Sequence, residues 1–100
     1  MNPAQPQDLH PDTLAVRQAL PRSVYGEHSE ALYLTSGFVQ PDAETAARRF
    51  AGEEDGYTYT RTSNPSVTAF ERRLAALEGA EAAIATSSGM SAILLMAMGL

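Results

Sequence analysis

The sequence predicts an α/β layer fold, and the observations that predict it lie in its second half. Asn64-Pro65 is a strong helix start, and Gly79 is placed to end that helix. The short apolar run AAIAT, residues 82–86, follows as a strand buried on both faces. Ser87-Ser88-Gly89 then makes a tight turn into a helix from Met90 onward, which is apolar all round and therefore expected to be buried. Helix, strand, glycine turn and helix in succession are typical of α/β proteins.

The elements of the first half are shorter and more polar. Residues 1–11, rich in Pro, Gln and Asn, are expected to form a mobile leader. Asp12 and Thr13 offer an N-cap to a helix over Leu14–Leu20, which Pro21 stops. The β-prone run ALYLTSGFV, residues 31–39, predicts a strand or an extended packing segment, and Gly37 weakens the strand interpretation.

Two further helices have clear local signals. Asp42 caps a helix that runs to about Ala51, in which Glu44 and Arg48 form a pair one turn apart and Gly52 ends the helix. The acidic loop at 53–56 is expected to be a solvated connection. In the helix after Asn64-Pro65, one apolar stripe recurs at three- and four-residue intervals, and its members are Val67, Phe70, Leu74 and Leu77.

Composition excludes several classes of function. The chain has 100 residues, 44% of them apolar, which suits one small globular domain. A net charge of −5 argues against a nucleic-acid-binding surface and against attraction to an anionic membrane. The absence of cysteine excludes disulfides, thiolate metal sites and a cysteine nucleophile, and the spacing of His10 and His28 predicts no metal site. All seven basic residues are arginines, so these residues alone cannot supply a Schiff-base lysine.

No signal peptide is visible, and the apolar run at 92–100 is far shorter than the roughly 18 residues of a spanning helix. A cytoplasmic protein is therefore the default expectation. The last helix stops without a polar cap, and a single parallel strand has no partner, so we expect the 100 residues to be the front of a longer protein.

Two stretches could bind an anion. Free N–H groups at the helix start after Ser87-Ser88-Gly89 would form an anion cradle, although any strand-to-helix turn uses Ser and Gly for capping. In an extended segment Tyr59 and Arg61 would project to one side, about 6.5 Å apart, and could hold two oxygens of one phosphate. Tyr57 would share that edge. Taken alone, Tyr59 and Arg61 suit an ordinary surface pair better than an anion site, because an arginine beside a tyrosine is usually such a pair.

The order of the motifs resembles a known family. Tyr59-Thr60-Arg61, Asn64-Pro65-Ser66, Leu77-Glu78-Gly79 and the run Ser87–Ser91 follow one another as in the cystathionine γ-synthase-like enzymes of cysteine and methionine metabolism, which depend on pyridoxal 5′-phosphate (PLP). Residues 12–19 and 30–39 are similar to that family's N-terminal arm. Within the family the chain most resembles the O-succinylhomoserine sulfhydrylases. Thr60 and Ser66 replace the usual Ser and Thr, and both keep a hydroxyl group.

This resemblance implies a fold, a cofactor and an assembly. Residues 1–55 would form the arm, and residues 56–100 would begin the large domain of a fold-type-I PLP-dependent transferase, a mostly parallel sheet with helices on both faces. The cofactor-binding residues would be Tyr59, Arg61, Ser88, Gly89 and Met90. Tyr59 and Arg61 would reach the cofactor of the neighbouring subunit, in a homodimer within a homotetramer. The chain would hold no catalytic residue, since the family's lysine, aspartate and ring-stacking tyrosine lie beyond residue 100.

The implied reaction is a γ-replacement in methionine biosynthesis that converts O-succinylhomoserine and sulfide to homocysteine and succinate. A cystathionine γ-synthase, or a lyase acting on cystathionine or methionine, would share every motif seen here. An alternative of another class is a short product that acts only in oligomerisation, without catalysis.

Overall fold

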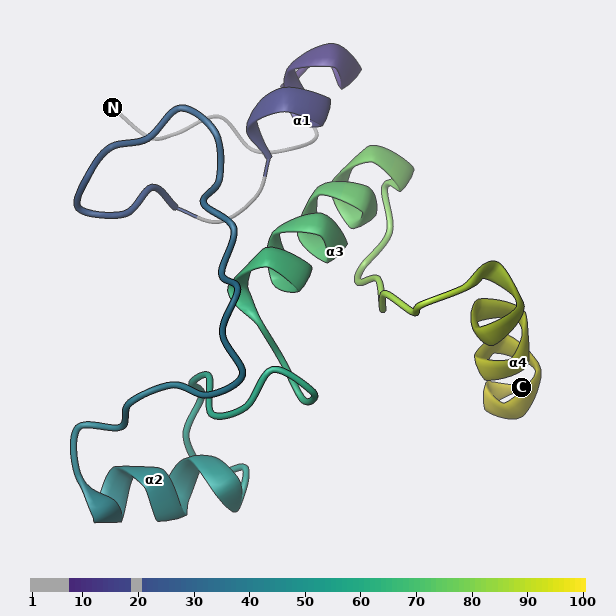
Figure 1. Cartoon of the computed structure of the whole chain (residues 1–100). Coiled ribbons are helices and arrows are strands. Elements are labelled where there is room, and N and C mark those ends of the chain that lie inside the picture. Colours follow the sequence, from purple (N-terminus) through teal and green to yellow (C-terminus); the bar gives the residue numbers. More distant parts are fainter. Residues whose placement is uncertain (1–7, 19–20) are drawn as a thin grey trace. The chain divides into compact units, whose positions relative to one another are not determined.

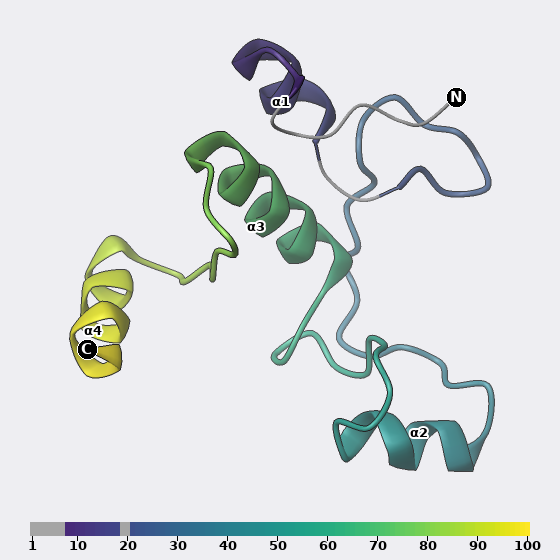
Figure 2. The ribbon, with the colours of Figure 1, turned by 180° about the vertical axis from the view of Figure 1, so that it is seen from behind.

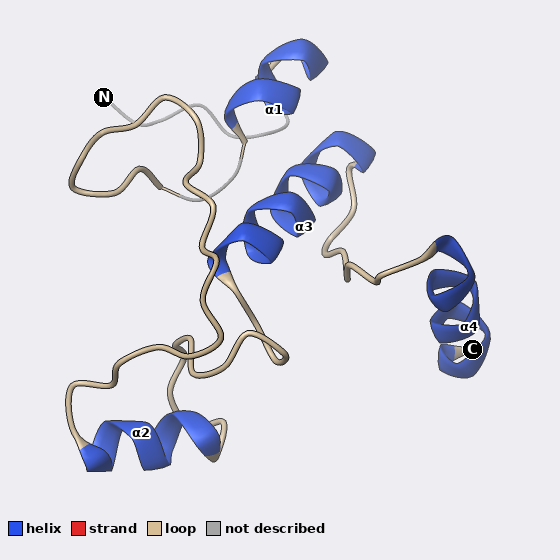
Figure 3. Cartoon of the chain, viewed as in Figure 1, coloured by secondary structure: helices blue, strands red, loops and turns tan. Residues whose placement is uncertain are grey.

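The computed structural model describes residues 8–18 and 21–100, and within them the chain is helical with connecting loops (Figures 1 and 3). The helices are α1 (Pro11–Arg17), α2 (Ala43–Phe50), α3 (Pro65–Glu78) and α4 (Gly89–Gly99), seen from behind in Figure 2. The chain divides into two compact units. Unit 1 comprises Met1–Gln18 with Phe70–Leu100, and unit 2 comprises Ala19–Ala69. The arm boundary near residue 55 stays a prediction.

Helix α1 begins earlier than predicted. Its N-cap is His10, whose Nδ1 accepts a hydrogen bond from the Asp12 N–H at 3.2 Å, and not Asp12 or Thr13. Pro11 at the first helical position explains the shift, because its backbone is pre-set for a helix and it needs no acceptor. The helix ends at Arg17; the predicted end at Leu20 and residues 1–7 of the predicted leader lie outside the described residues.

Helix α3 follows the local rules of the sequence, but its packing face differs from the predicted one. It starts at Asn64-Pro65 and ends at Gly79, whose φ of +64° is in the left-handed region, with the Ala80 N–H donating to the Ala75 carbonyl at 2.8 Å. The buried positions are Pro65 at the start of the helix and the small Ala69 and Ala75. The predicted stripe is exposed instead, from 38% at Leu74 to 57% at Phe70.

The strand predicted at residues 82–86 is not formed. Residues 82–86 form neither a helix nor a strand, they have no ladder partner among the described residues, and Ile84 is 79% exposed. Within the segment, the Ala85 N–H donates to Glu71 Oε2 on α3 at 2.7 Å, and Thr86 Oγ1 donates to the Ser88 carbonyl at 2.7 Å. A parallel strand requires a neighbouring strand on at least one side, so an apolar run alone cannot produce one.

Helix α4 forms where predicted, but the prediction that it is buried is wrong for the described chain. None of its residues is buried, and Met90 and Met98 are 73% and 75% exposed. Elsewhere in unit 1, Leu14 of α1 is buried and the Arg73 Nε on α3 donates to the Gln18 carbonyl at 3.0 Å, just after α1.

In unit 2 the segment 31–39 is extended and lies antiparallel to the chain before α3. An isolated bridge pairs Gly37 with Tyr59, flanked by the Phe38 N–H to Thr58 carbonyl bond at 3.3 Å and the Thr60 N–H to Ser36 carbonyl bond at 2.8 Å. The strand alternative is wrong for the described chain, since only an isolated bridge forms, and the packing alternative is not borne out, because the apolar side chains of the segment are exposed, Leu34 at 92% and Val39 at 99%.

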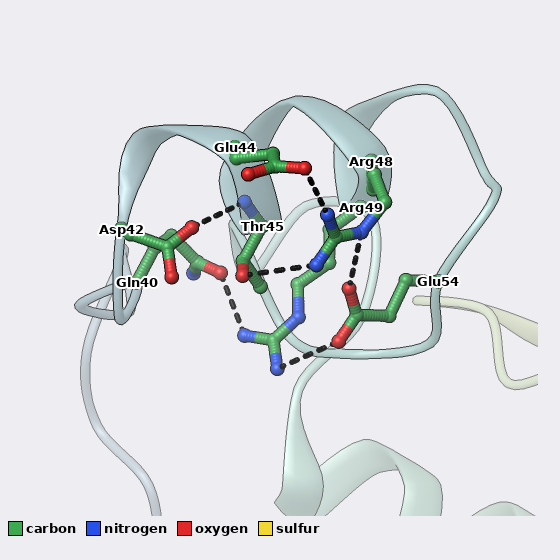
Figure 4. A network of polar contacts seen from close by, with 7 residues as sticks. All are labelled: Gln40, Asp42, Glu44, Thr45, Arg48, Arg49 and Glu54. Carbon is green, nitrogen blue, oxygen red and sulfur yellow. Dashed lines mark hydrogen bonds and ion pairs between the residues drawn. The ribbon is translucent and has the colours of Figure 1, made fainter.

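Helix α2 has the predicted cap and end. Asp42 Oδ1 accepts the Thr45 N–H at 2.6 Å, and this hydrogen bond lowers the pKa of the Asp42 carboxyl. Gly52, with φ +76°, follows the helix, and Arg48 pairs with Glu44 at 3.0 Å as predicted. The loop at 53–56 is more than a solvated connection, because Glu54 also accepts from Arg48 Nε at 3.0 Å (Figure 4).

The same network of polar contacts connects α2 to the segment 31–39 and to the chain around Tyr57. Arg49 Nη1 donates to Gln40 Oε1 at 2.7 Å (Figure 4), and Gln40 Nε2 donates to the carbonyls of Phe38 and Tyr57, each at 2.9 Å. One glutamine thus joins the helix to the chain on either side of the bridge, just ahead of Tyr59.

Candidate functional site

Tyr59 and Arg61 lie on a tight turn. The Tyr59 carbonyl accepts the Thr62 N–H at 3.0 Å and the Ser63 N–H at 3.1 Å, so the chain folds back directly after Tyr59. The predicted extended geometry is therefore wrong from Thr60 to Thr62. The two side chains still come together, because the Arg61 guanidinium carbon lies 5.2 Å from the centroid of the Tyr59 ring, in a cation–π arrangement.

The positive charge of Arg61 forms no ion pair within the described residues. Both side chains are exposed, Tyr59 at 42%. Within residues 8–18 and 21–100, no carboxylate lies within ion-pair distance of Arg61, whereas Arg48 binds both Glu44 and Glu54. A stacked guanidinium keeps its N–H groups at the ring's edge, where they can donate to an anion.

Tyr57 does not share this edge, contrary to the prediction. Its hydroxyl group donates to Thr68 Oγ1 on α3 at 3.1 Å, and its ring packs 5.6 Å from that of Phe38. Tyr57 is therefore part of the packing of unit 2. Only Tyr59 and Arg61 remain candidates for anion binding in this segment.

Sequence reasoning missed the residue that supports the turn. Asn64 was assigned only as a helix cap, and its Oδ1 does accept the Ser66 N–H at 2.8 Å. Its side-chain amide also donates to Thr60 Oγ1 at 3.0 Å and to the Tyr33 carbonyl at 2.9 Å. The second partner lies 31 residues away, and no local pattern in the sequence indicates it.

The other candidate site is the start of α4. Ser88 is the N-cap, and its Oγ accepts the Ser91 N–H at 3.1 Å while donating to Ser91 Oγ at 2.9 Å. The Ala92 N–H already bonds to the Ser88 carbonyl at 3.2 Å. The N–H groups of Gly89 and Met90 donate to no acceptor in the described chain, and both residues are exposed. Two N–H groups at the positive end of an eleven-residue helix are thus open to an anion.

Gly89 is not required by the chain's own conformation. Its φ is not in the left-handed region, and a Cβ built on it would meet nothing within 4 Å. The absence of a side chain leaves the two N–H groups accessible to a ligand oxygen at close range. The hydroxyl group of Ser88, in contrast, is already engaged with Ser91, so Ser88 orients the helix start.

The two candidate sites belong to separate units of the chain. Tyr59 and Arg61 lie in unit 2, and Ser88, Gly89 and Met90 lie in unit 1. In the part of the chain that the structure describes, no group of three or more His, Cys, Asp or Glu could hold a metal ion. Among those same residues, no helix is both long and apolar enough to cross a membrane.

Comparison with known proteins gives a family and relatives. The model of the Cys/Met metabolism PLP-dependent enzyme family matches residues 12–100. An O-succinylhomoserine sulfhydrylase of Pseudomonas aeruginosa is 58% identical over 89 residues, which are 89% of this chain and 22% of that protein. One of Mycobacterium tuberculosis is 49% identical over 90 residues, 90% of this chain and 22% of the relative. An L-methionine γ-lyase of Fusobacterium nucleatum is 49% identical over 81 residues, 81% of this chain and 20% of that protein.

Solved structures are also similar. A Campylobacter jejuni protein described as an O-acetylhomoserine (thiol)-lyase, with a pyridoxyl-lysine phosphate, matches with a TM-score of 0.87 and 30% identity, over 92% of this chain and 23% of that one. The metB protein of Corynebacterium glutamicum matches with a TM-score of 0.78 and 31% identity, over 93% and 23%. The chain spans about a fifth of the length of the curated relatives it matches.

These matches test the sequence-based predictions. The family predicted from the four motifs, its PLP dependence and the fold-type-I fold class are confirmed. The prediction of an enzyme of sulfur amino-acid metabolism is confirmed at the level of the family.

Proposed function

Because the chain belongs to the family of PLP-dependent enzymes of cysteine and methionine metabolism, we propose that it is the N-terminal part of an O-succinylhomoserine sulfhydrylase. The observation that carries this proposal is the 58% identity over 89 residues to the Pseudomonas aeruginosa sulfhydrylase. The methionine γ-lyases match at 49% over 81 residues in Fusobacterium nucleatum and at 55% over only 62 residues in Pseudomonas deceptionensis. The proposed reaction replaces succinate by sulfide at the γ-carbon of O-succinylhomoserine and yields homocysteine. PLP, when bound, supplies an electron sink for such a replacement.

The contribution of this chain is to hold the cofactor's phosphate group. The open N–H groups of Gly89 and Met90 would donate to phosphate oxygens, with the dipole of α4 favouring the negative charge. The chemistry of the donors fits a dianion, since nothing in the described chain occupies them and no acidic residue stands in the first turn of α4. Ser88 would hold the helix start in this orientation through its bonds to Ser91.

Tyr59 and Arg61 would complete the phosphate site in a neighbouring subunit. A phenol hydroxyl group and a guanidinium on one exposed turn offer donors of different reach to a single phosphate. Residues 1–55 would form the arm that joins the subunits, and residues 56–100 the start of the PLP-binding domain, in a homodimer within a homotetramer. Removing a charge-assisted hydrogen bond with Arg61→Ala should weaken phosphate anchoring by about 1.5–3 kcal/mol.

The test of the reaction uses the whole protein that carries this sequence, loaded with PLP. We expect O-succinylhomoserine and sulfide to give homocysteine and succinate, and L-methionine alone to give little turnover. The second candidate is a methionine γ-lyase, which the 49% identity over 81 residues favours. Fast release of methanethiol from L-methionine, without sulfide-dependent formation of homocysteine, would decide for this lyase and against the sulfhydrylase.

The test of the phosphate role compares two ligands. Arg61→Ala should weaken the binding of PLP and leave the binding of pyridoxal, which lacks the phosphate, unchanged. Equal affinities of the wild type and the Arg61→Ala variant for PLP would contradict the assignment of Arg61.

A further inference from the structure

We propose that Asn64 is a positioning residue for cofactor binding: it ties the extended segment 31–39 to the turn that carries Tyr59 and Arg61, and so sets the affinity for the phosphate. This inference rests on the proposed phosphate role of those two side chains. It concerns a residue that makes no contact with the phosphate itself in the proposed site.

The polar groups of Asn64 are fully engaged inside the protein. The residue is 3% exposed. Both donors of its amide are used, one by the Tyr33 carbonyl at 2.9 Å and one by Thr60 Oγ1 at 3.0 Å, while its Oδ1 accepts the Ser66 N–H at 2.8 Å. A helix cap needs only the oxygen, which Asp, Ser or Thr would also supply. The two donated bonds require an amide, so capping alone does not explain an asparagine here.

Thr60 connects the hydrogen bonds of Asn64 to the turn that carries Tyr59 and Arg61. It lies between Tyr59 and Arg61, accepts from Asn64, and its hydroxyl group donates to the Thr35 carbonyl. Its backbone N–H donates to the Ser36 carbonyl at 2.8 Å. Thr60 is thus held by the segment 31–39 on one side and by the start of α3 on the other.

The segment 31–39 is itself held by the start of α3. The Tyr33 N–H donates to Ser66 Oγ at 2.8 Å, and the Tyr33 carbonyl accepts from Asn64, so one residue of the segment is fixed at both of its backbone groups. Among the described residues, the side chains of Tyr59 and Arg61 interact with no side chain other than each other, at 5.2 Å. Their direction therefore depends on the backbone that Asn64 and Thr60 fix, and small displacements of a binding group are costly.

The experiment uses the whole apo protein and compares the dissociation constants of PLP and pyridoxal. Asn64→Ser keeps a neutral cap oxygen and removes both donated bonds, and Thr60→Val removes the hydroxyl group. Each variant should weaken PLP binding about tenfold, the equivalent of one net hydrogen bond, and leave pyridoxal binding unchanged. Thr60→Ser should bind PLP as the wild type does. Thr45→Val, which removes a buried hydroxyl group on α2, is the matched control and should leave both constants unchanged.

A double-mutant cycle with Arg61→Ala separates positioning from general destabilisation. In the Arg61→Ala background, most of the effect of Asn64→Ser on PLP binding should disappear, since the positioned group is gone. Wild-type PLP affinity in Asn64→Ser and Thr60→Val, equal weakening of PLP and pyridoxal, or full additivity with Arg61→Ala would each overturn the inference. If Arg61→Ala alone leaves PLP binding unchanged, the phosphate role fails, and the inference fails with it.

Discussion

Gly56 lies against the guanidinium of Arg49, and this contact gives a sharp prediction. A Cβ at residue 56 would lie 2.2 Å from Arg49 Nε and 2.6 Å from Arg49 Cζ, well inside any allowed contact. The arginine is not free to move away, since Nη1 donates to Gln40 at 2.7 Å and Nη2 lies 3.9 Å from Glu54 (Figure 4). Gly56→Ala must therefore displace the guanidinium from these partners.

The cost follows from what the displacement breaks. The charged hydrogen bond to Gln40 contributes about 1.5–3 kcal/mol, and the longer pair with Glu54 contributes little. The displacement also has a favourable contribution. Arg49 Nε is buried without a hydrogen-bond partner in the described chain, and displacement would let it form a hydrogen bond with water. Because this gain offsets part of the loss, we expect Gly56→Ala to cost about 1–2 kcal/mol of local stability.

The assay is native-state hydrogen exchange across residues 40–57 of the whole protein, which reports the free energy of local opening. Gly37→Ala is the matched control and should be close to neutral, since a Cβ there meets nothing within 4 Å. In an Arg49→Ala background the cost of Gly56→Ala should nearly vanish. Wild-type protection in Gly56→Ala, or an undiminished cost without the guanidinium, would refute the reasoning.

Three other predictions concern single residues. Gly89→Ala should leave the stability of the apo protein unchanged, because a Cβ meets nothing within 4 Å, yet weaken PLP binding at least about tenfold against pyridoxal; equal weakening of both would contradict the phosphate role. Tyr57→Phe should lower the free energy of unfolding by about 1 kcal/mol through the lost hydrogen bond to Thr68 and leave the affinity for PLP unchanged. A loss of PLP affinity in a titration would show instead that Tyr57 takes part in phosphate binding. The Asp42 pKa is lowered by the Thr45 N–H, so its stabilisation of α2 is complete above the ordinary aspartate pKa and is lost as the pH falls through the folded value. Asp42→Asn keeps the cap without a charge and should flatten that pH dependence of exchange, whereas an unchanged profile would assign it to another group.

The features predicted correctly from the sequence are those fixed by neighbouring residues. The Asp42 cap, the Glu44–Arg48 pair and the glycine ends at Gly52 and Gly79 each depend on a few consecutive residues, and the structure has all of them. The open N–H groups at the start of α4 follow in the same way from a Ser-Gly turn into a helix.

The features predicted wrongly depend on contacts between residues that are far apart in the sequence. The apolar character of residues 82–86 and of α4 predicts that both segments are buried against a core. No part of the described chain covers either of them. Alternation around Tyr59 predicted an extended edge, whereas the turn after it is fixed by Asn64, which also bonds Tyr33 across 31 residues. A period-2 pattern contains no information on such a contact.

The central claim is that one phosphate is held by Gly89 and Met90 of one subunit and by Tyr59 and Arg61 of another. Arg61→Ala should weaken PLP binding by about 1.5–3 kcal/mol, and Gly89→Asp should weaken it further by placing a carboxylate against the phosphate. When the two variants are mixed and allowed to exchange subunits, some dimers pair an intact helix start with an intact Arg61. We expect tight PLP binding at about a quarter of the sites, as random pairing across a two-fold interface gives. No recovery of PLP binding in verified mixed assemblies would contradict the shared site.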